Sequence, residues 1–261
     1  MATGIPGEKS AEFIVVLGSM LKSRATFNEL SYRRFLREIG KVNSANSASA
    51  LGLFYAVAGE LDKSNAIFDE ACYKYADNSV CKNHLIALGY TGQTNLLKNK
   101  SYEYADRYES KELSMIAYTY AYWFGDREGV IRYMDKHIRL LSAEEGRELA
   151  EKQKEELLSD LNDAYEASGC SEEQFEKLAL IIFQVANNFD ADIFRIEAGR
   201  KGNSCYVADI NNKDPKTIAK MNSTLAEAVC NEPVLDDCNL IGRFSPQRQL
   251  HGDIGYGYKR Q

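Results

Sequence analysis

Proline is scarce in this chain of 261 residues: only 4 occur, and none lies between residues 7 and 214. Proline removes a backbone hydrogen-bond donor and clashes with the preceding helical turn, so its absence leaves a long stretch free to form uninterrupted helices. Hydrophobic residues make up 44% and charged residues 27% of the chain, which is close to ordinary globular usage. The sequence therefore predicts a folded, largely helical protein with a core of its own.

The chain also lacks paired cysteines and long apolar segments. The apolar run at residues 13–20 is too short to cross a membrane, and it has neither the basic flank nor the small-residue cleavage site of a secretory signal. None of the six cysteines has a neighbour at the CxxC spacing of zinc and redox sites; they are Cys72, Cys81, Cys170, Cys205, Cys230 and Cys238. We therefore expect reduced thiols, a cytoplasmic location and no membrane association.

Positive charge is not in excess, since the formal net charge is −6. Duplex nucleic acid attracts proteins mainly through basic side chains that displace counterions, so we expect no duplex partner. The segment at residues 255–260 mixes tyrosine with basic residues, a composition that can stack on single-stranded nucleic acid. A flexible terminus explains the same composition, and we assign residues 246–261 to such a tail.

Motifs that carry catalytic chemistry are missing as well. The three histidines, His84, His137 and His251, have no cysteine or carboxylate at metal-ligand spacing. The pair Gly199 and Gly202 lacks the lysine that ends a phosphate-binding loop, and no serine sits in a nucleophile elbow. We therefore predict no catalytic residue, no metal and no cofactor.

One enzymatic alternative remains open near the predicted C-terminal strands. Carboxylates beside a lysine can hold Mg²⁺ and activate water in hydrolases and nucleases. With a turn centred on residue 201, however, Asp209 would face Ile193 across the hairpin rather than another carboxylate, and solvated strand positions explain the charges equally well. The residues concerned are Asp192, Glu197, Asp209 and Lys213.

Three glycines mark an internal repeat. Gly59, Gly92 and Gly125 lie at intervals of 33 residues, and each follows an apolar segment with helical patterning. Glycine is favoured where a helix ends in a left-handed residue and the chain turns back. Repeats of this length are typical of stacked helical hairpins, each of which buries its apolar face only against its neighbours.

The first repeat resembles the tetratricopeptide family. It has Leu51-Gly52-x2-Tyr55, then Gly59, Phe68 and Ala71, which follows the family pattern of L-G-x2-Y and later A-x3-F and A. It departs from that pattern in three places, and the second and third repeats are degenerate. The resemblance covers residues 45–141. The departures are Ala48 for tryptophan, Ser64 for alanine and Ala76 for proline.

The flanking segments extend this architecture. Residues 10–40 predict a further hairpin without the glycine, because apolar residues recur at helical spacing on both sides of a polar break. A capping box at Ser142 and Glu145 predicts that a charged helix opens there and runs to residue 168. We therefore expect a mainly α fold, with a tetratricopeptide-like solenoid of stacked antiparallel hairpins over residues 10–168.

The C-terminal part has a different pattern, in which predicted strands alternate with helices. A second capping box, Ser171 with Gln174, predicts a buried helix, and residues 193–196, 205–210 and 240–244 read as strands. Asp214 followed by Pro215 predicts the start of another helix. We expect a small α+β module over residues 171–245.

The resemblance implies a binding groove lined by the first helix of each hairpin. Such grooves hold peptide or protein segments, and some hold a C-terminal carboxylate with a clamp of basic and amide side chains that is missing here. The groove would instead be mostly apolar and aromatic, as in tetratricopeptide chaperones that hold apolar segments, and large aromatic side chains make good interface anchors. Packing of the same aromatics inside the fold is the alternative. The implied groove residues are Leu53, Val57, Lys82, Ile86, Tyr90, Met115, Thr119, Tyr122 and Trp123.

Three functions stay open at this point. The first is a protein-interaction scaffold, adaptor or chaperone, that holds an apolar segment of another protein. The second is a metal-dependent hydrolase in the C-terminal module. The third is a structural subunit of a larger assembly.

Overall fold

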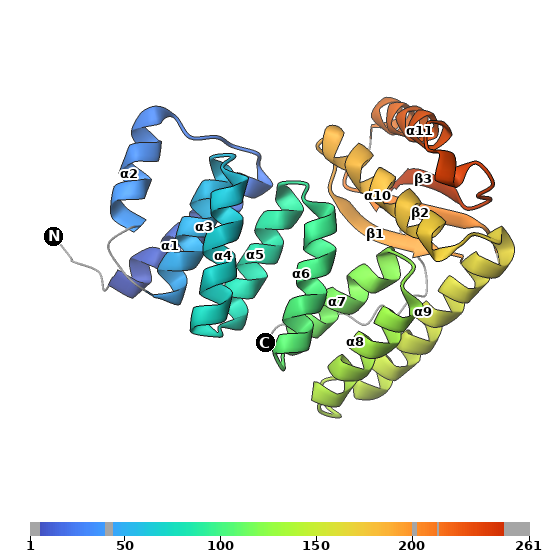
Figure 1. The fold of residues 1–261 in the computed structure, drawn as a ribbon, viewed down its shortest axis with the longest axis horizontal. Helices are drawn as coiled ribbons and strands as arrows, with labels where there is room; N and C mark the ends of the chain where they lie inside the picture. Colours follow the sequence, from blue (N-terminus) through green and yellow to red (C-terminus); the bar gives the residue numbers. More distant parts are fainter. Residues whose placement is uncertain (1–5, 40–43, 200–202, 213, 248–261) are drawn as a thin grey trace. The chain divides into compact units, whose positions relative to one another are not determined.

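The computed structural model describes residues 6–39, 44–199, 203–212 and 214–247, and it divides into two compact units, Met1–Tyr108 and Glu109–Gln261 (Figure 1). Helices dominate the described residues, and three strands form one small sheet near the C-terminus. This confirms the predicted mainly α fold with a small α+β C-terminal module. The boundary expected between residues 168 and 171 falls inside the second unit. Lys213 and residues 248–261 of the expected tail lie outside the described residues.

The first unit is helical throughout its described part, and α3 lies at its centre. The helices α1, α2, α4 and α5 all pack against α3, and α1 also packs against α5. Leu53 and Phe54 of α3 are therefore buried, together with Leu17 of α1 and Phe68 of α4. The helices are α1 (Pro6–Lys22), α2 (Glu29–Ile39), α3 (Ala45–Val57), α4 (Leu61–Tyr75), α5 (Asn78–Tyr90) and α6 (Thr94–Arg107).

One turn recurs at each repeat glycine. Gly59, Gly92 and Gly125 have φ values of 76°, 71° and 75°, the left-handed conformation that glycine adopts without steric cost. In each turn the residue after the glycine donates its N–H to the carbonyl five residues earlier, which is the Schellman arrangement. These bonds run from Glu60 to Tyr55 at 2.9 Å, from Gln93 to Leu88 at 3.0 Å and from Asp126 to Ala121 at 2.8 Å. The 33-residue period is thus repeated in the backbone hydrogen bonds.

The turn after α1 has the same bonds without glycine. Arg24 has a φ of 53°, its N–H donates to Leu21 at 3.1 Å, and the N–H of Ala25 donates to Met20 at 2.9 Å. A non-glycine residue in this conformation is uncommon. The helices expected within residues 10–40 are present as α1 and α2.

Gly52 and Ser64 are explained by the close approach of α3 and α4. A Cβ atom at Gly52 would lie 2.5 Å from the ring of Phe68, so no larger residue fits there. The hydroxyl of Ser64 donates to the carbonyl of Gly52 at 2.8 Å. Ser64 therefore ties the two helices of the hairpin together.

The second unit continues with a hairpin, a long helix and the α+β module. The helices α7 and α8 pack against each other, α9 packs against α8 and β1, and α10 and α11 both pack against β3. Figure 1 shows α10 lying across the sheet. The elements are α7 (Lys111–Trp123), α8 (Arg127–Leu140), α9 (Arg147–Ser168), α10 (Glu172–Asn188), β1 (Ile193–Ala198), β2 (Cys205–Ile210), α11 (Pro215–Cys230), a short 3₁₀ helix (Pro233–Leu235) and β3 (Ile241–Pro246).

The sheet has the order β1-β2-β3. The strands β1 and β2 form the predicted antiparallel hairpin, whereas β3 pairs parallel to β2 after the crossover through α11. Tyr206 of β2 is fully buried, and its ring lies 5.5 Å from that of Phe175 on α10. Gly242 of β3 lies beneath Ile182 of the same helix. The sheet core is therefore formed against the apolar face of α10.

Two of the predicted helix starts are confirmed and one is shifted. Ser171 and Gln174 form a reciprocal capping box before α10, and Asp214 caps α11 with Pro215 in the first turn. The box at Ser142 and Glu145 also forms, but it holds a turn, and α9 begins only at Arg147. Gly146 has a left-handed φ of 87°, which interrupts the helix before that point.

Candidate interaction surface

The α5 row, defined as Lys82, Ile86 and Tyr90, is the part of the implied groove that lies at the surface. These side chains follow one another at intervals of four residues along α5 and so share one face. Ile86 is 42% exposed, and Lys82 and Tyr90 are half-buried. The opposite face of α5 contributes Leu85 and Leu88 to the core of the first unit.

The corresponding residues of α3 are not at the surface, which corrects the expectation for Leu53 and Val57. Their side chains are only 1% and 7% exposed. The physical reason is that α1 packs against both α3 and α5, so α3 is surrounded by other helices of its unit. These two residues belong to the core and cannot contact a partner while α1 stays in place.

In the second unit, α7 places its four implied groove residues in different surroundings. Met115 and Thr119 are half-buried, and the hydroxyl of Thr119 donates back to the carbonyl of Met115 at 2.8 Å. Trp123 is half-buried, with its ring 5.7 Å from that of Phe183 on α10. Tyr122 is only 5% exposed, which corrects its assignment to a groove.

The burial of Tyr122 is explained by the edge of the sheet. The N–H of Ala198 at the end of β1 donates to the Tyr122 hydroxyl at 3.2 Å. Burial raises the pKa of this hydroxyl, so it stays protonated. Nearby, the Tyr206 hydroxyl donates to the carbonyl of Trp123 at 2.8 Å. The end of α7 thus anchors the β1–β2 hairpin, which is the packing alternative considered for these aromatics.

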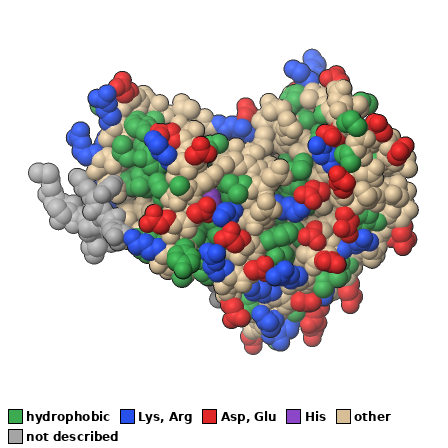
Figure 2. All heavy atoms as spheres, viewed as in Figure 1, with side chains coloured by type: hydrophobic (Ala, Val, Ile, Leu, Met, Phe, Trp, Pro, Cys, Tyr) green, Lys and Arg blue, Asp and Glu red, His purple; other side chains and the backbone are tan. Residues whose placement is uncertain are grey.

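An aromatic cluster in the first unit was missed by the sequence reasoning. Phe27 lies between α1 and α2, and its ring is 5.4 Å from that of Phe35 and 4.9 Å from that of Phe54. The ring of Tyr32 lies 4.8 Å from that of Phe54 at an angle of 50°, and the Tyr32 hydroxyl donates to Glu60 at 2.6 Å. Figure 2 shows hydrophobic side chains gathered on this part of the first unit. The cluster could not be read from the sequence, because its rings come together through tertiary packing and have no periodic spacing.

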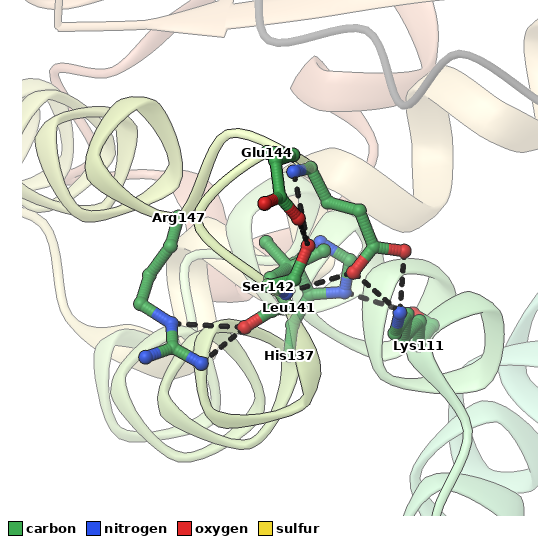
Figure 3. A network of polar contacts seen from close by, with 7 residues as sticks. Lys111, His137, Leu141, Ser142, Glu144 and Arg147 are labelled. Atoms are coloured by element: carbon green, nitrogen blue, oxygen red, sulfur yellow. Dashed lines mark hydrogen bonds and ion pairs between the residues drawn. The ribbon is translucent and has the colours of Figure 1, made fainter.

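A polar network joins the start of α7 to the turn before α9 (Figure 3). Lys111 pairs with both carboxylate oxygens of Glu145 at 2.5 and 2.6 Å, and its backbone carbonyl lies 2.9 Å from Nδ1 of His137. Arg147 donates from two of its nitrogens to the carbonyl of Leu141. Hydrogen bonding from Lys111 lowers the pKa of Glu145, and burial lowers the pKa of His137. The network contributes to holding the α7–α8 hairpin and α9 together.

The acidic residues of the sheet are arranged differently from the expectation. The hairpin pairs about a centre one residue later along the chain than expected, so Asp209 lies opposite Arg195, and a bulge between Ile193 and Arg195 places Ile193 opposite Ile210. Arg195 also lies 3.6 Å from Glu197, measured between their charged atoms. Arg195 is thus the strand partner of Asp209 and the ion-pair partner of Glu197.

The arrangement of the described residues bears on the expectations about metal binding and membranes. Within the described ranges, no three His, Cys, Asp or Glu side chains lie close enough together to hold a metal ion. No helix in this part of the chain is both long and apolar enough to cross a lipid bilayer. Comparison of the chain with protein-family models, with curated protein sequences and with solved structures finds no significant match in any of the three.

Proposed function

We propose that the protein is an interaction scaffold, an adaptor or chaperone-like binder, whose α5 row holds an apolar segment of a partner protein. On this proposal the hairpins are tetratricopeptide-like repeats. The recurrence of one Schellman turn every 33 residues supports that relationship, as does the close approach of Gly52 to Phe68 within the first repeat. Of the nine implied groove residues, the proposal keeps Lys82, Ile86 and Tyr90 as partner-binding residues.

The exposure of Ile86 is the observation that carries the proposal. It lies at the centre of the α5 row in the position that the repeat assigns to the groove, and 42% of its surface is open to solvent. Burying a whole isoleucine side chain contributes about 1.5–3 kcal/mol, so covering the open part of Ile86 would contribute about 1 kcal/mol. Binding of useful strength therefore requires Tyr90 to be covered by the same segment.

The test compares two isoleucines of equal exposure. Ile131 on α8 in the second unit is 43% exposed and serves as the matched control. Short peptides displayed on phage would be selected on the wild-type protein and then titrated against Ile86→Asp and Ile131→Asp. An unpaired carboxylate at the centre of the α5 row must be desolvated when the peptide binds. We expect Ile86→Asp to weaken binding about tenfold or more, which corresponds to about 1.4 kcal/mol, and Ile131→Asp to leave it unchanged.

Circular dichroism and thermal melting of both variants control for folding. Selected peptides that bind Ile86→Asp as well as they bind the wild type would contradict the assignment of the α5 row. A loss that is equal for both variants would also contradict it, because the effect would then not be specific to this row.

A further inference from the structure

Cys72 and Cys81 lie opposite each other in the α4–α5 hairpin. The two helices are joined by the short turn at Ala76 and Asp77, and each cysteine is four residues, about one helical turn, from it. The thiols of Cys72 and Cys81 are hydrogen-bonded to each other, and the two side chains are 1% and 0% exposed, so both lie on the buried, facing sides of their helices.

The pair belongs to a buried polar cluster contributed by three helices. Tyr104 of α6 places its hydroxyl 2.7 Å from Nδ1 of His84 and within hydrogen-bonding distance of the Cys72 thiol. Nε2 of His84 lies 3.3 Å from the side-chain oxygen of Asn65, and its ring stacks on Phe68 with centroids 4.8 Å apart. Tyr108, which follows α6, also contacts this cluster: its hydroxyl donates to the backbone carbonyl of Cys72 at 2.5 Å.

The two thiols differ in their electrostatic surroundings. Cys72 accepts hydrogen bonds from Cys81 first and then from His84 and Tyr104, and these lower its pKa despite burial. Cys81 donates its proton to Cys72, and this together with burial raises its pKa. A thiolate is the nucleophilic form of cysteine, so Cys72 is the more nucleophilic of the two thiols and Cys81 keeps its proton.

We propose that Cys72 and Cys81 form a reversible intramolecular disulfide, with a hydroperoxide as oxidant and a dithiol as reductant. In the first step the Cys72 sulfur attacks the terminal oxygen of the hydroperoxide, the O–O bond breaks, and a sulfenic acid forms, while the departing hydroxide or alkoxide takes the proton lost by the Cys72 thiol and becomes water or an alcohol. In the second step the Cys81 sulfur attacks that of Cys72, the S–O bond breaks, and the leaving hydroxide takes the Cys81 proton to become water. With hydrogen peroxide, two thiols lose two electrons and two hydrogens in all, and two water molecules are released.

The disulfide would tie α4 to α5 one turn beyond their connection. A disulfide holds its two Cα atoms about 4.4–6.8 Å apart. Packed helix axes are about 8–10 Å apart and each Cα lies about 2.3 Å from its axis, so facing Cα atoms are about 3.4–5.4 Å apart and the bond fits a packed hairpin. Because both thiols are buried, the oxidant reaches them through a local opening of the hairpin. The α5 row begins at Lys82, next to Cys81, so oxidation would act on the helix that carries it.

The experiment uses the full chain in its reduced form. After treatment with hydrogen peroxide and denaturation, free thiols are alkylated, and peptide mapping identifies the cysteines that are no longer free. We expect a cross-linked peptide containing Cys72 and Cys81, a mass lower by two hydrogens before alkylation, and full reversal by dithiothreitol. In Cys81→Ser the resolving thiol is missing, so a dimedone adduct should accumulate on Cys72.

Matched controls come from the other cysteines. Cys170→Ser removes a buried thiol of the second unit and should leave the cross-link unchanged, whereas Cys72→Ser should abolish both the cross-link and the dimedone adduct. The proposal is overturned if Cys72 and Cys81 stay fully alkylatable under conditions that oxidise the exposed Cys230, or if the cross-link joins a different pair. Mapping of the wild type decides this even if a substituted chain fails to fold.

Discussion

Replacing Gly125 with alanine tests whether the repeat glycine is needed for its backbone, for space or for both. Gly125 has a φ of 75°, and a Cβ atom there would lie 2.5 Å from the ring of Phe175 and 2.7 Å from the Tyr165 hydroxyl. That hydroxyl also donates to the carbonyl of Gly125 at 2.8 Å. Gly169 of the same unit has a φ of 65° with nothing within 4 Å of the added Cβ. The two positions therefore differ in space and agree in backbone conformation.

The expected losses of unfolding free energy follow from the backbone conformation and the available space at each position. The left-handed conformation costs alanine about 1–2 kcal/mol, and this is the whole expected effect of Gly169→Ala. Gly125→Ala adds the strain of a methyl group forced into a filled site, about 1–3 kcal/mol, for a total of about 2–5 kcal/mol. With a urea dependence of about 2 kcal/mol per molar, the midpoint should fall by about 0.5–1 M for Gly169→Ala and about 1–2.5 M for Gly125→Ala.

Urea unfolding followed by tryptophan fluorescence is the assay. The chain has one tryptophan, Trp123, which lies in the second unit with both glycines, so one signal follows the unfolding of the unit that each substitution affects. Far-ultraviolet circular dichroism provides an independent probe of the same transition. Equal midpoints for the two variants, or a milder effect of Gly125→Ala, would refute the close packing of the turn after α7 against Phe175 and Tyr165.

Further predictions concern other parts of the second unit. Burial lowers the pKa of His137 from 6.5, so its imidazole is protonated more readily in the unfolded chain than in the folded one. The free energy of unfolding should therefore fall as the pH drops below 6.5. His137→Asn should reduce this fall, which urea titrations at pH 7 and pH 5 would measure. Asp214→Ala removes the cap that accepts the Thr217 N–H at 3.0 Å, which should cost about 0.5–2 kcal/mol and speed hydrogen exchange at the start of α11. Tyr206→Phe should cost about 1–3 kcal/mol in the same unfolding assay, because a buried hydroxyl no longer donates to the carbonyl of Trp123.

The repeat turns could be predicted because their cause is local. A left-handed residue at the end of a helix is a property of the backbone, and glycine reveals it in the sequence at Gly59, Gly92 and Gly125. The caps at Ser171 and Asp214 are local in the same way, and both formed where expected. The α1–α2 turn shows the limit of this signal. Arg24 adopts the same left-handed conformation, and an arginine in the sequence does not indicate it.

The exposure of the implied groove could not be predicted, because it depends on distant segments. Leu53 is covered because α1, far earlier in the chain, packs on α3 and α5. Tyr122 is covered because β1, far later, brings the N–H of Ala198 to its hydroxyl. The strand register was also predicted wrongly, because the pairing of β1 with β2 is centred one residue later than the glycine-rich segment suggested, which moves the partner of Asp209 from Ile193 to Arg195.

Equivalent positions in the three repeats show what decides whether a repeat face can bind. Leu53, Ile86 and Thr119 occupy the same place relative to their turns, and so do Val57, Tyr90 and Trp123. In α3 these positions are buried by a neighbouring helix, and at the end of α7 Trp123 packs against Phe183 of α10. In α5 the central side chain is left at the surface. A repeated turn therefore fixes the backbone of each hairpin, while the segment that packs on the hairpin determines whether its inner face becomes core or remains available to a partner.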